Sequence, residues 1–279
     1  MGHGVLLTKV SSGCPLNRRN YHPSAQSLLG ALYVQGKGVP QDYSKAASWF
    51  LKSAVQGDAD AQYNLGLLYV RGRGVPQDFA KAVPWFRKAA EQGYANAQYN
   101  LGVAYANGQG VKQNYSEAVV WYRKAAEQGN VRAQFNLGGA YASGQGVKQD
   151  NTAAVRWFRK AADGDLVNAQ YNMGVAYANG QGVKQDYPEA VSWYRRAAEQ
   201  GHPQAQFALG AAYANGQGVP QDYVQAMKWM ILAQQNGLKG SKELSQTISV
   251  LKQRMTDSQL TEARKVADQW LKAHHKKQA

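Results

Sequence analysis

The chain has 279 residues, of which 44% are hydrophobic, and a formal net charge of +14. This length is sufficient for a domain with a sizeable hydrophobic core. Cys14 is the only cysteine, which excludes an intrachain disulfide and a thiolate metal cluster. No apolar stretch approaches the roughly 20 residues needed to cross a bilayer, and residues 1–10 lack a secretory signal pattern. We therefore expect a cytoplasmic protein by default, and a periplasmic or secreted one if the sequence lacks its natural start.

The N-terminal segment, residues 1–24, shows no helical periodicity and carries Lys9, Arg18 and Arg19 without any acidic residue. We expect this segment to be disordered or to form a partial cap. Positive charge is denser here and in the C-terminal tail than in the region between them.

A 36-residue repeat occupies residues 25–238, and its signature residues recur six times at fixed spacing. In the third repeat these residues are Ala97, Leu101, Gly102, Tyr105 and Trp121. A Gly-x-Gly-Val sequence follows the tyrosine in every repeat. The predicted repeats are residues 25–60, 61–96, 97–132, 133–168, 169–204 and 205–238.

Each repeat is predicted to form two helices. Ala97, Leu101 and Tyr105 have the spacing of one helical face, and a second apolar face surrounds Trp121. The first helix should end at a glycine in the left-handed conformation. An Asp or Asn should cap the second helix, and the candidate residues are Asp42, Asp78, Asn114, Asp150, Asp186 and Asp222. We expect the second helix to approach closely at Gly102, with Trp121 lying over this gap.

Two repeats depart from the pattern. Pro84 lies inside a predicted helix and should kink it. Gly164 and Asp165 replace the Gln-Gly pair that ends the preceding repeat, which puts the turn after the fourth repeat in doubt.

Residues 239–279 are predicted to form a C-terminal helical cap with a basic tail. A helix is expected over about Lys242–Arg254, and Thr256 with Gln259 forms a capping-box pattern before another helix. The apolar stripe of that last helix consists of Leu260, Ala263, Ala267, Trp270 and Leu271.

The repeat pattern resembles the Sel-1-like repeat, a relative of the tetratricopeptide repeat, and the resemblance covers residues 25–238. It implies an all-α, right-handed α-solenoid of six helix-turn-helix repeats with C-terminal capping helices, acting as an adaptor for protein complexes. The tail resembles one that often ends bacterial members of this family. A cysteine-rich branch linked to β-lactam binding carries two cysteines per repeat. The present repeats contain none, so that activity is not carried over.

The resemblance also implies a partner-binding face on the first helices, where an Asn before the Leu-Gly pair contacts the partner backbone. The matching residues are Asn64, Asn100, Asn136 and Asn172, and Asn107, Asn179 and Asn215 follow seven residues after this position on the same face. Asn is unfavourable inside helices, and its amide can pair with a peptide main chain. Alternatively, these amides bond between neighbouring repeats or persist from recent duplication. Core packing is favoured over groove lining for Tyr63, Tyr99, Phe135, Tyr171 and Phe207.

The sequence gives no support for catalysis, a cofactor or a metal. Its five histidines are scattered. The Gly-x-Gly-Val sequence follows a helix and lacks the third glycine of a phosphate-binding loop. We therefore predict a non-catalytic scaffold that binds a protein or peptide in the concave groove.

The alternative function is electrostatic binding of a polyanion, namely nucleic acid, anionic lipid or an acidic protein. It rests on the basic tails and on a stripe formed by Arg87-Lys88, Arg123-Lys124, Arg159-Lys160 and Arg195-Arg196. A solvated outer face is the simpler explanation of this stripe, because Arg123 and Glu127 are spaced to form an ion pair.

Overall fold

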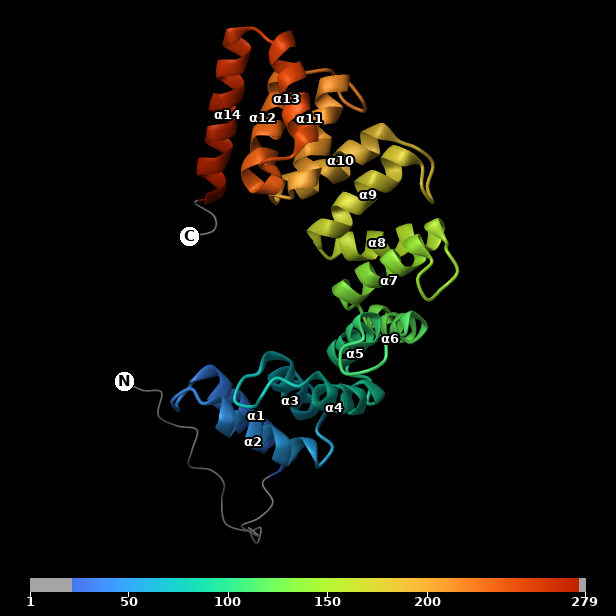
Figure 1. Ribbon diagram of the computed structural model, residues 1–279, viewed down its shortest axis with the longest axis vertical. Helices are drawn as coiled ribbons and strands as arrows, with labels where there is room; N and C mark the ends of the chain where they lie inside the picture. The colour runs from blue at the N-terminus through green and yellow to red at the C-terminus, as the bar shows by residue number, and fades with distance from the viewer. Residues whose placement is uncertain (1–21, 276–279) are drawn as a thin grey trace, which may run out of the picture. The chain divides into compact units, whose positions relative to one another are not determined.

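The computed structural model describes residues 22–275, and within this range its regular secondary structure is entirely helical (Figure 1). The segment predicted over residues 1–24 lies outside the described residues, except for its last three. The elements are α1 (Pro23–Gln35), α2 (Tyr43–Ala54), α3 (Ala59–Arg71), α4 (Phe79–Glu91), α5 (Ala95–Asn107), α6 (Tyr115–Glu127), α7 (Val131–Ser143), α8 (Asn151–Asp163), α9 (Val167–Asn179), α10 (Tyr187–Glu199), α11 (Pro203–Asn215), α12 (Tyr223–Ala233), the π-helix η1 (Gln234–Leu238), α13 (Lys242–Arg254) and α14 (Asp257–His275).

The helices form two compact units, one ending at Tyr94 and the other beginning at Ala95. Helices α1 to α4 of the first unit pack consecutively, each on the next. In the second unit α5 to α12 do the same, and α13 and α14 both pack on α12 (Figure 1). The all-α solenoid fold predicted from the sequence is confirmed.

The loop inside each repeat is held by its own hydrogen bonds. In the third repeat Gly108 has a φ of +68°, and the Gln113 side chain donates to the carbonyl of Ala106 at 2.7 Å. The Asn114 side chain accepts from the backbone N–H of Glu117 and so caps α6. Caps of this kind are made by each of the predicted residues, Asp42, Asp78, Asn114, Asp150, Asp186 and Asp222.

The mid-helix glycine allows the two helices of a repeat to pack closely. A Cβ atom on Gly102 would lie 2.6 Å from the ring of Tyr122. The predicted position of Trp121 over this glycine is therefore wrong, because the next residue fills the gap. The tryptophan of the fifth repeat, Trp193, instead belongs to a hydrophobic cluster with Phe158 and Ala161 of the preceding repeat.

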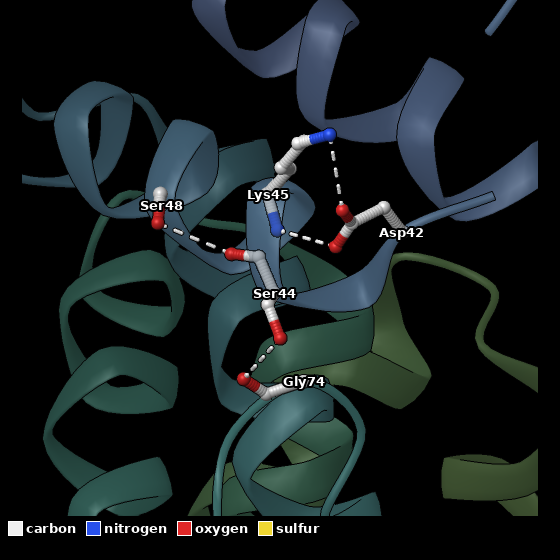
Figure 2. Close-up of polar contacts among 5 residues, drawn as sticks. All are labelled: Asp42, Ser44, Lys45, Ser48 and Gly74. Carbon is white, nitrogen blue, oxygen red and sulfur yellow. Dashed lines mark hydrogen bonds and ion pairs between the residues drawn. The ribbon is translucent and has the colours of Figure 1, made fainter. Parts of the chain in front are cut away.

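The second loop glycine allows close packing between neighbouring repeats. A Cβ atom on Gly74 would lie 2.2 Å from the carbonyl carbon of Tyr43, at the start of α2. Figure 2 shows the adjoining contact, in which the Ser44 hydroxyl donates to the carbonyl of Gly74 at 3.2 Å. In the same view the carboxylate of Asp42 accepts from the backbone N–H of Lys45 at 2.9 Å. The loop of one repeat thus rests on the capped N-terminus of the preceding second helix.

The two irregular repeats retain the regular fold. Helix α4 continues through Pro84 as a single helix from Phe79 to Glu91. At the doubtful turn, the backbone N–H of Leu166 bonds to the carbonyl of Ala161 at 3.1 Å, as Asn130 does to Ala125 one repeat earlier. Asp165 adopts a φ of +58°, the single left-handed non-glycine residue among those described. Asp tolerates this conformation better than most residues, which explains why the turn survives.

The C-terminal cap has the predicted helix boundaries. Helix α13 spans Lys242–Arg254. The capping box is formed by a bond from the Thr256 backbone N–H to the Gln259 side chain at 2.9 Å and its reciprocal bond at 3.3 Å. Trp270 of α14 meets Trp229 of α12 edge-on, with ring centroids 6.1 Å apart. This contact covers the last repeat with an aromatic side chain, as Trp193 covers the repeat before its own.

Substituting the two classes of loop glycine should separate strain within a turn from packing between repeats. Both Gly129 and Gly146 have a positive φ, so alanine at either costs about 1 kcal/mol. A Cβ on Gly129 meets nothing within 4 Å, whereas one on Gly146 would lie 2.3 Å from the backbone of Tyr115. We expect Gly146→Ala to lower the free energy of unfolding by about 1–3 kcal/mol more than Gly129→Ala does. Urea denaturation followed by circular dichroism measures this, and equal losses would contradict the packing role.

His202 should make stability dependent on pH. Its Nδ1 accepts from the backbone N–H of Ala205 at 3.2 Å, and burial lowers its pKa. The cap contributes fully above the ordinary pKa of about 6.5 and is lost as the pH falls through the lowered pKa of the folded state. We expect acidification from pH 7.5 to pH 5 to lower the urea midpoint of the native chain more than that of His202→Asn, since an asparagine cap does not titrate. Parallel pH profiles of the two urea midpoints would refute this.

Candidate protein-interaction groove

A hollow of about 540 Å³, the larger hollow, lies between α5, α6 and α7. It is formed by the end of one first helix, the second helix of that repeat and the first helix of the next. Its lining residues are Ala106, Asn107, Gln113, Tyr115, Ala118, Val119, Tyr122, Phe135, Asn136, Gly139, Ala140, Ser143 and Gln145.

Aromatic rings and amides on this hollow are held in place by the surrounding fold. The side-chain amide of Gln113 donates to the hydroxyl of Tyr115 at 3.0 Å while also bonding the end of α5. Phe135 packs against Phe158, with ring centroids 5.6 Å apart. A ligand entering the hollow would therefore meet side chains whose positions are already fixed, which reduces the entropy lost on binding.

Tyr122 is a neutral hydrogen-bonding group at the base of the larger hollow. Burial raises the pKa of its phenol to about 12, and a hydrogen bond with Asn136 opposes that rise. The phenol consequently keeps its proton at physiological pH. Asn136 belongs to the repeat after that of Tyr122, so this bond also joins two repeats.

A second hollow of about 290 Å³, the smaller hollow, lies one repeat further along. Gly139 borders both hollows, since it lies on the helix that separates them. The lining residues of the smaller hollow are Gly139, Ala142, Asn151, Ala154, Val155, Phe158, Asn172, Val175, Ala176 and Gln181.

Neither hollow is lined by a charged residue, although the chain carries a net charge of +14. Their polar groups are amides and hydroxyls, which both donate and accept hydrogen bonds. Their apolar surface comes from aromatic rings and small aliphatic side chains. Such a lining is suited to a polypeptide main chain with uncharged side chains and unsuited to a polyanion.

The predicted Asn residues fall into three groups in the structure. Asn107 and Asn136 both line the larger hollow, and Asn172 lines the smaller one. Asn64 lies in the first compact unit, where its side chain donates to the carbonyl of Asp60 within the same helix at 2.9 Å. The remaining residues, Asn100, Asn179 and Asn215, line neither hollow.

Both interpretations of the Asn series have contacts that match them. The bond between Asn136 and Tyr122 is a link between repeats, whereas the side-chain amide of Asn172 has no hydrogen-bonding partner among residues 22–275. Phe135, for which core packing was favoured, packs on Phe158 and also lines the larger hollow.

Sequence reasoning missed Gly139 and Asn151. Other repeats carry Ala31, Leu67, Val103, Val175 and Ala211 at the position of Gly139, and Tyr43, Phe79, Tyr115, Tyr187 and Tyr223 at the position of Asn151. The signal was therefore available as a departure of the fourth repeat from the other five. The functional relevance of these two departures became clear only once the structure placed both residues at the edge of a hollow.

The basic stripe is engaged in contacts of its own. Arg123 donates to the hydroxyl of Tyr141 at 2.9 Å, where an ion pair with Glu127 was expected. Equivalent bonds join Arg159 to Tyr177 and Arg195 to Tyr213. The second basic residue of each pair covers a tryptophan ring, and these cation–π pairs are Lys88 on Trp85, Lys124 on Trp121, Lys160 on Trp157 and Arg196 on Trp193. In the first repeat Lys52 covers Trp49 in the same way.

In the part of the chain that the structure describes, no group of three or more His, Cys, Asp and Glu residues is arranged to hold a metal ion. Among the same residues, no helix is both long and apolar enough to cross a membrane.

A solenoid of stacked helix pairs with a grooved, amide-lined face defines a helical-repeat protein. The chain belongs to the Sel1 repeat family, whose model matches residues 23–58, 59–94, 95–130, 131–166, 167–202 and 203–238. Proteins of this family are generally non-enzymatic and typically serve as scaffolds that bind protein partners.

Several solved structures are similar to the chain. A Sel1 repeat protein from Oxalobacter formigenes is 38% identical, with a TM-score of 0.67, over 76% of this chain and 85% of that one. A protective antigen of uropathogenic Escherichia coli with an SLR fold is 31% identical over 90% of this chain and 69% of its own, with a TM-score of 0.43. A Sel1 repeat protein from Klebsiella pneumoniae is 26% identical over 68% and 92%, also with a TM-score of 0.43. The comparison with curated proteins gave no match.

Two adjacent glycines of α7 should respond in opposite ways to alanine. A Cβ on Gly138 would lie 2.7 Å from the Phe158 ring, so Gly138→Ala should cost about 1–3 kcal/mol. A Cβ on Gly139 meets nothing within 4 Å, so Gly139→Ala should gain about 1 kcal/mol of helix propensity. Urea denaturation of both variants measures the difference. A loss of stability in Gly139→Ala would show that the glycine has a packing role.

Proposed function

We propose that the chain is a non-catalytic scaffold that binds an extended segment of a partner protein along the groove formed by α5 to α9. The observation that carries this proposal is the uncharged, amide- and aromatic-lined pair of hollows in a strongly basic chain. Such a surface matches the chemistry of a peptide main chain more closely than that of a charged ligand.

The side chains support a division of roles within the groove. The free amide of Asn172 can accept from and donate to a peptide bond at once. Asn136 presents its remaining hydrogen-bonding groups one repeat earlier, beside the ring of Phe135. Main-chain bonds then supply affinity, and the hollows between the amides select side chains.

Electrostatic binding of a polyanion is the less favoured function. Arg123, Arg159 and Arg195 donate to tyrosine hydroxyls, and the basic residue after each of them lies on a tryptophan ring. These contacts give the stripe a role in holding neighbouring repeats and covering their aromatic side chains. The positive charge remains on the surface, so salt dependence is the measurement that separates the two functions.

Removing the two amides of the hollows should abolish partner capture. We expect a protein partner captured from nuclease-treated lysate by the native chain to be lost at least about tenfold from a variant with Asn136→Ala and Asn172→Ala. Capture by the native chain should be similar at about 0.1 M and about 0.5 M NaCl, because the groove is uncharged. Quantitative mass spectrometry of the captured protein measures both effects.

The matched control carries Asn215→Ala and Gln246→Ala, which remove exposed amides of α11 and α13 that line neither hollow. Capture by this variant should equal that of the native chain, and circular dichroism should show the same helix content in all three proteins. Equal loss from both double variants would contradict the groove as the binding site. Capture of acidic material alone, released by salt, would instead support the polyanion function.

A further inference from the structure

The fourth repeat lacks two side chains that the other repeats place beside the groove. Gly139 stands where the others have Ala, Val or Leu, and Asn151 stands where they have Tyr or Phe. Both residues border the smaller hollow, and Gly139 borders the larger one as well. The fourth repeat therefore carries smaller side chains than the other repeats at two positions of the groove lining.

Packing does not account for the glycine at position 139. The neighbouring Gly138 is required because Phe158 occupies the space of a Cβ atom. At Gly139 that space is open, and the residue is only partly buried. A glycine inside a helix costs about 1 kcal/mol relative to alanine. The fourth repeat therefore loses stability at Gly139, and in return the space beside the groove stays open there.

We infer that the gap at Gly139 is a specificity pocket that takes one large uncharged side chain of the bound peptide. This inference rests on the proposed function and adds which residue of the peptide is recognised. Gly139 borders both the hollow lined by Phe135 and Tyr122 and the hollow lined by Asn172. A side chain seated over Gly139 would have Asn136 on one side and Asn172 on the other, and these amides can bond the main chain flanking it.

The lining decides which side chains fit. An aromatic or long aliphatic side chain would bury its surface against Phe135 and the small residues of α7. A Lys, Arg, Asp or Glu side chain would lose water without gaining an opposite charge, since neither hollow is lined by one. The peptide is therefore recognised by Phe, Tyr, Trp, Leu or Met at one position.

A displayed library of random dodecapeptides, selected on the full chain at about 0.15 M NaCl, tests this inference. We expect the enriched peptides to share one position occupied by a large uncharged residue. Gly139→Val should restore the side chain that the third and fifth repeats carry and weaken binding of the enriched synthetic peptide at least about tenfold. Gly139→Ala should give a smaller loss, because it fills less of the gap. Fluorescence anisotropy with the labelled peptide measures these affinities.

Ser192→Val is the matched control, because it adds the same residue at an exposed site of α10 that lines neither hollow. It should leave the affinity unchanged. Unaltered binding to Gly139→Val would overturn the pocket while leaving the groove in place, provided that the Asn136→Ala, Asn172→Ala variant still loses the peptide. Enrichment of acidic, salt-sensitive peptides, or of none, would overturn both the pocket and the proposed function.

Discussion

The stacking of one repeat on the next depends on a close backbone contact at the second glycine of the loop. At Gly74, Gly146, Gly182 and Gly218 a Cβ atom would collide with the backbone that begins the preceding second helix. The N-cap of that helix and the loop hydrogen bonds hold both partners of the contact in place. Tryptophan side chains then cover the junction between repeats. Stability in such an array is the sum of neighbouring contacts, so each junction matters locally.

Regular stacking has a consequence for function, because successive junctions within the second unit are built from equivalent residues and produce similar hollows. A site that prefers one peptide side chain over others must then arise where one repeat departs from the rest. The fourth repeat departs at Gly139 and Asn151, beside the groove, and also at Asp165 in its final turn. The first two departures change the volume and chemistry of the hollows, whereas the turn keeps its hydrogen bonds despite the third.

The distribution of charge separates the two sides of the repeat chemically. The basic residues on the second helices are tied to tyrosine hydroxyls and tryptophan rings, while the hollows near the first helices are uncharged. Positive charge on the second helices therefore does not require an anionic ligand. It also keeps the exposed surface soluble and leaves the groove free for a neutral peptide.

The sequence by itself determined the helix pairs, the loop caps and the capping box of the last helix, because these depend on residues within one repeat. Only the tertiary structure decided which side chain fills the space at Gly102, that Arg123 meets Tyr141, and that Gly139 borders two hollows. Each of these depends on how close a neighbouring helix comes. Spacing along the chain gives the face on which a residue lies, but the distance between helices is set by packing across repeats.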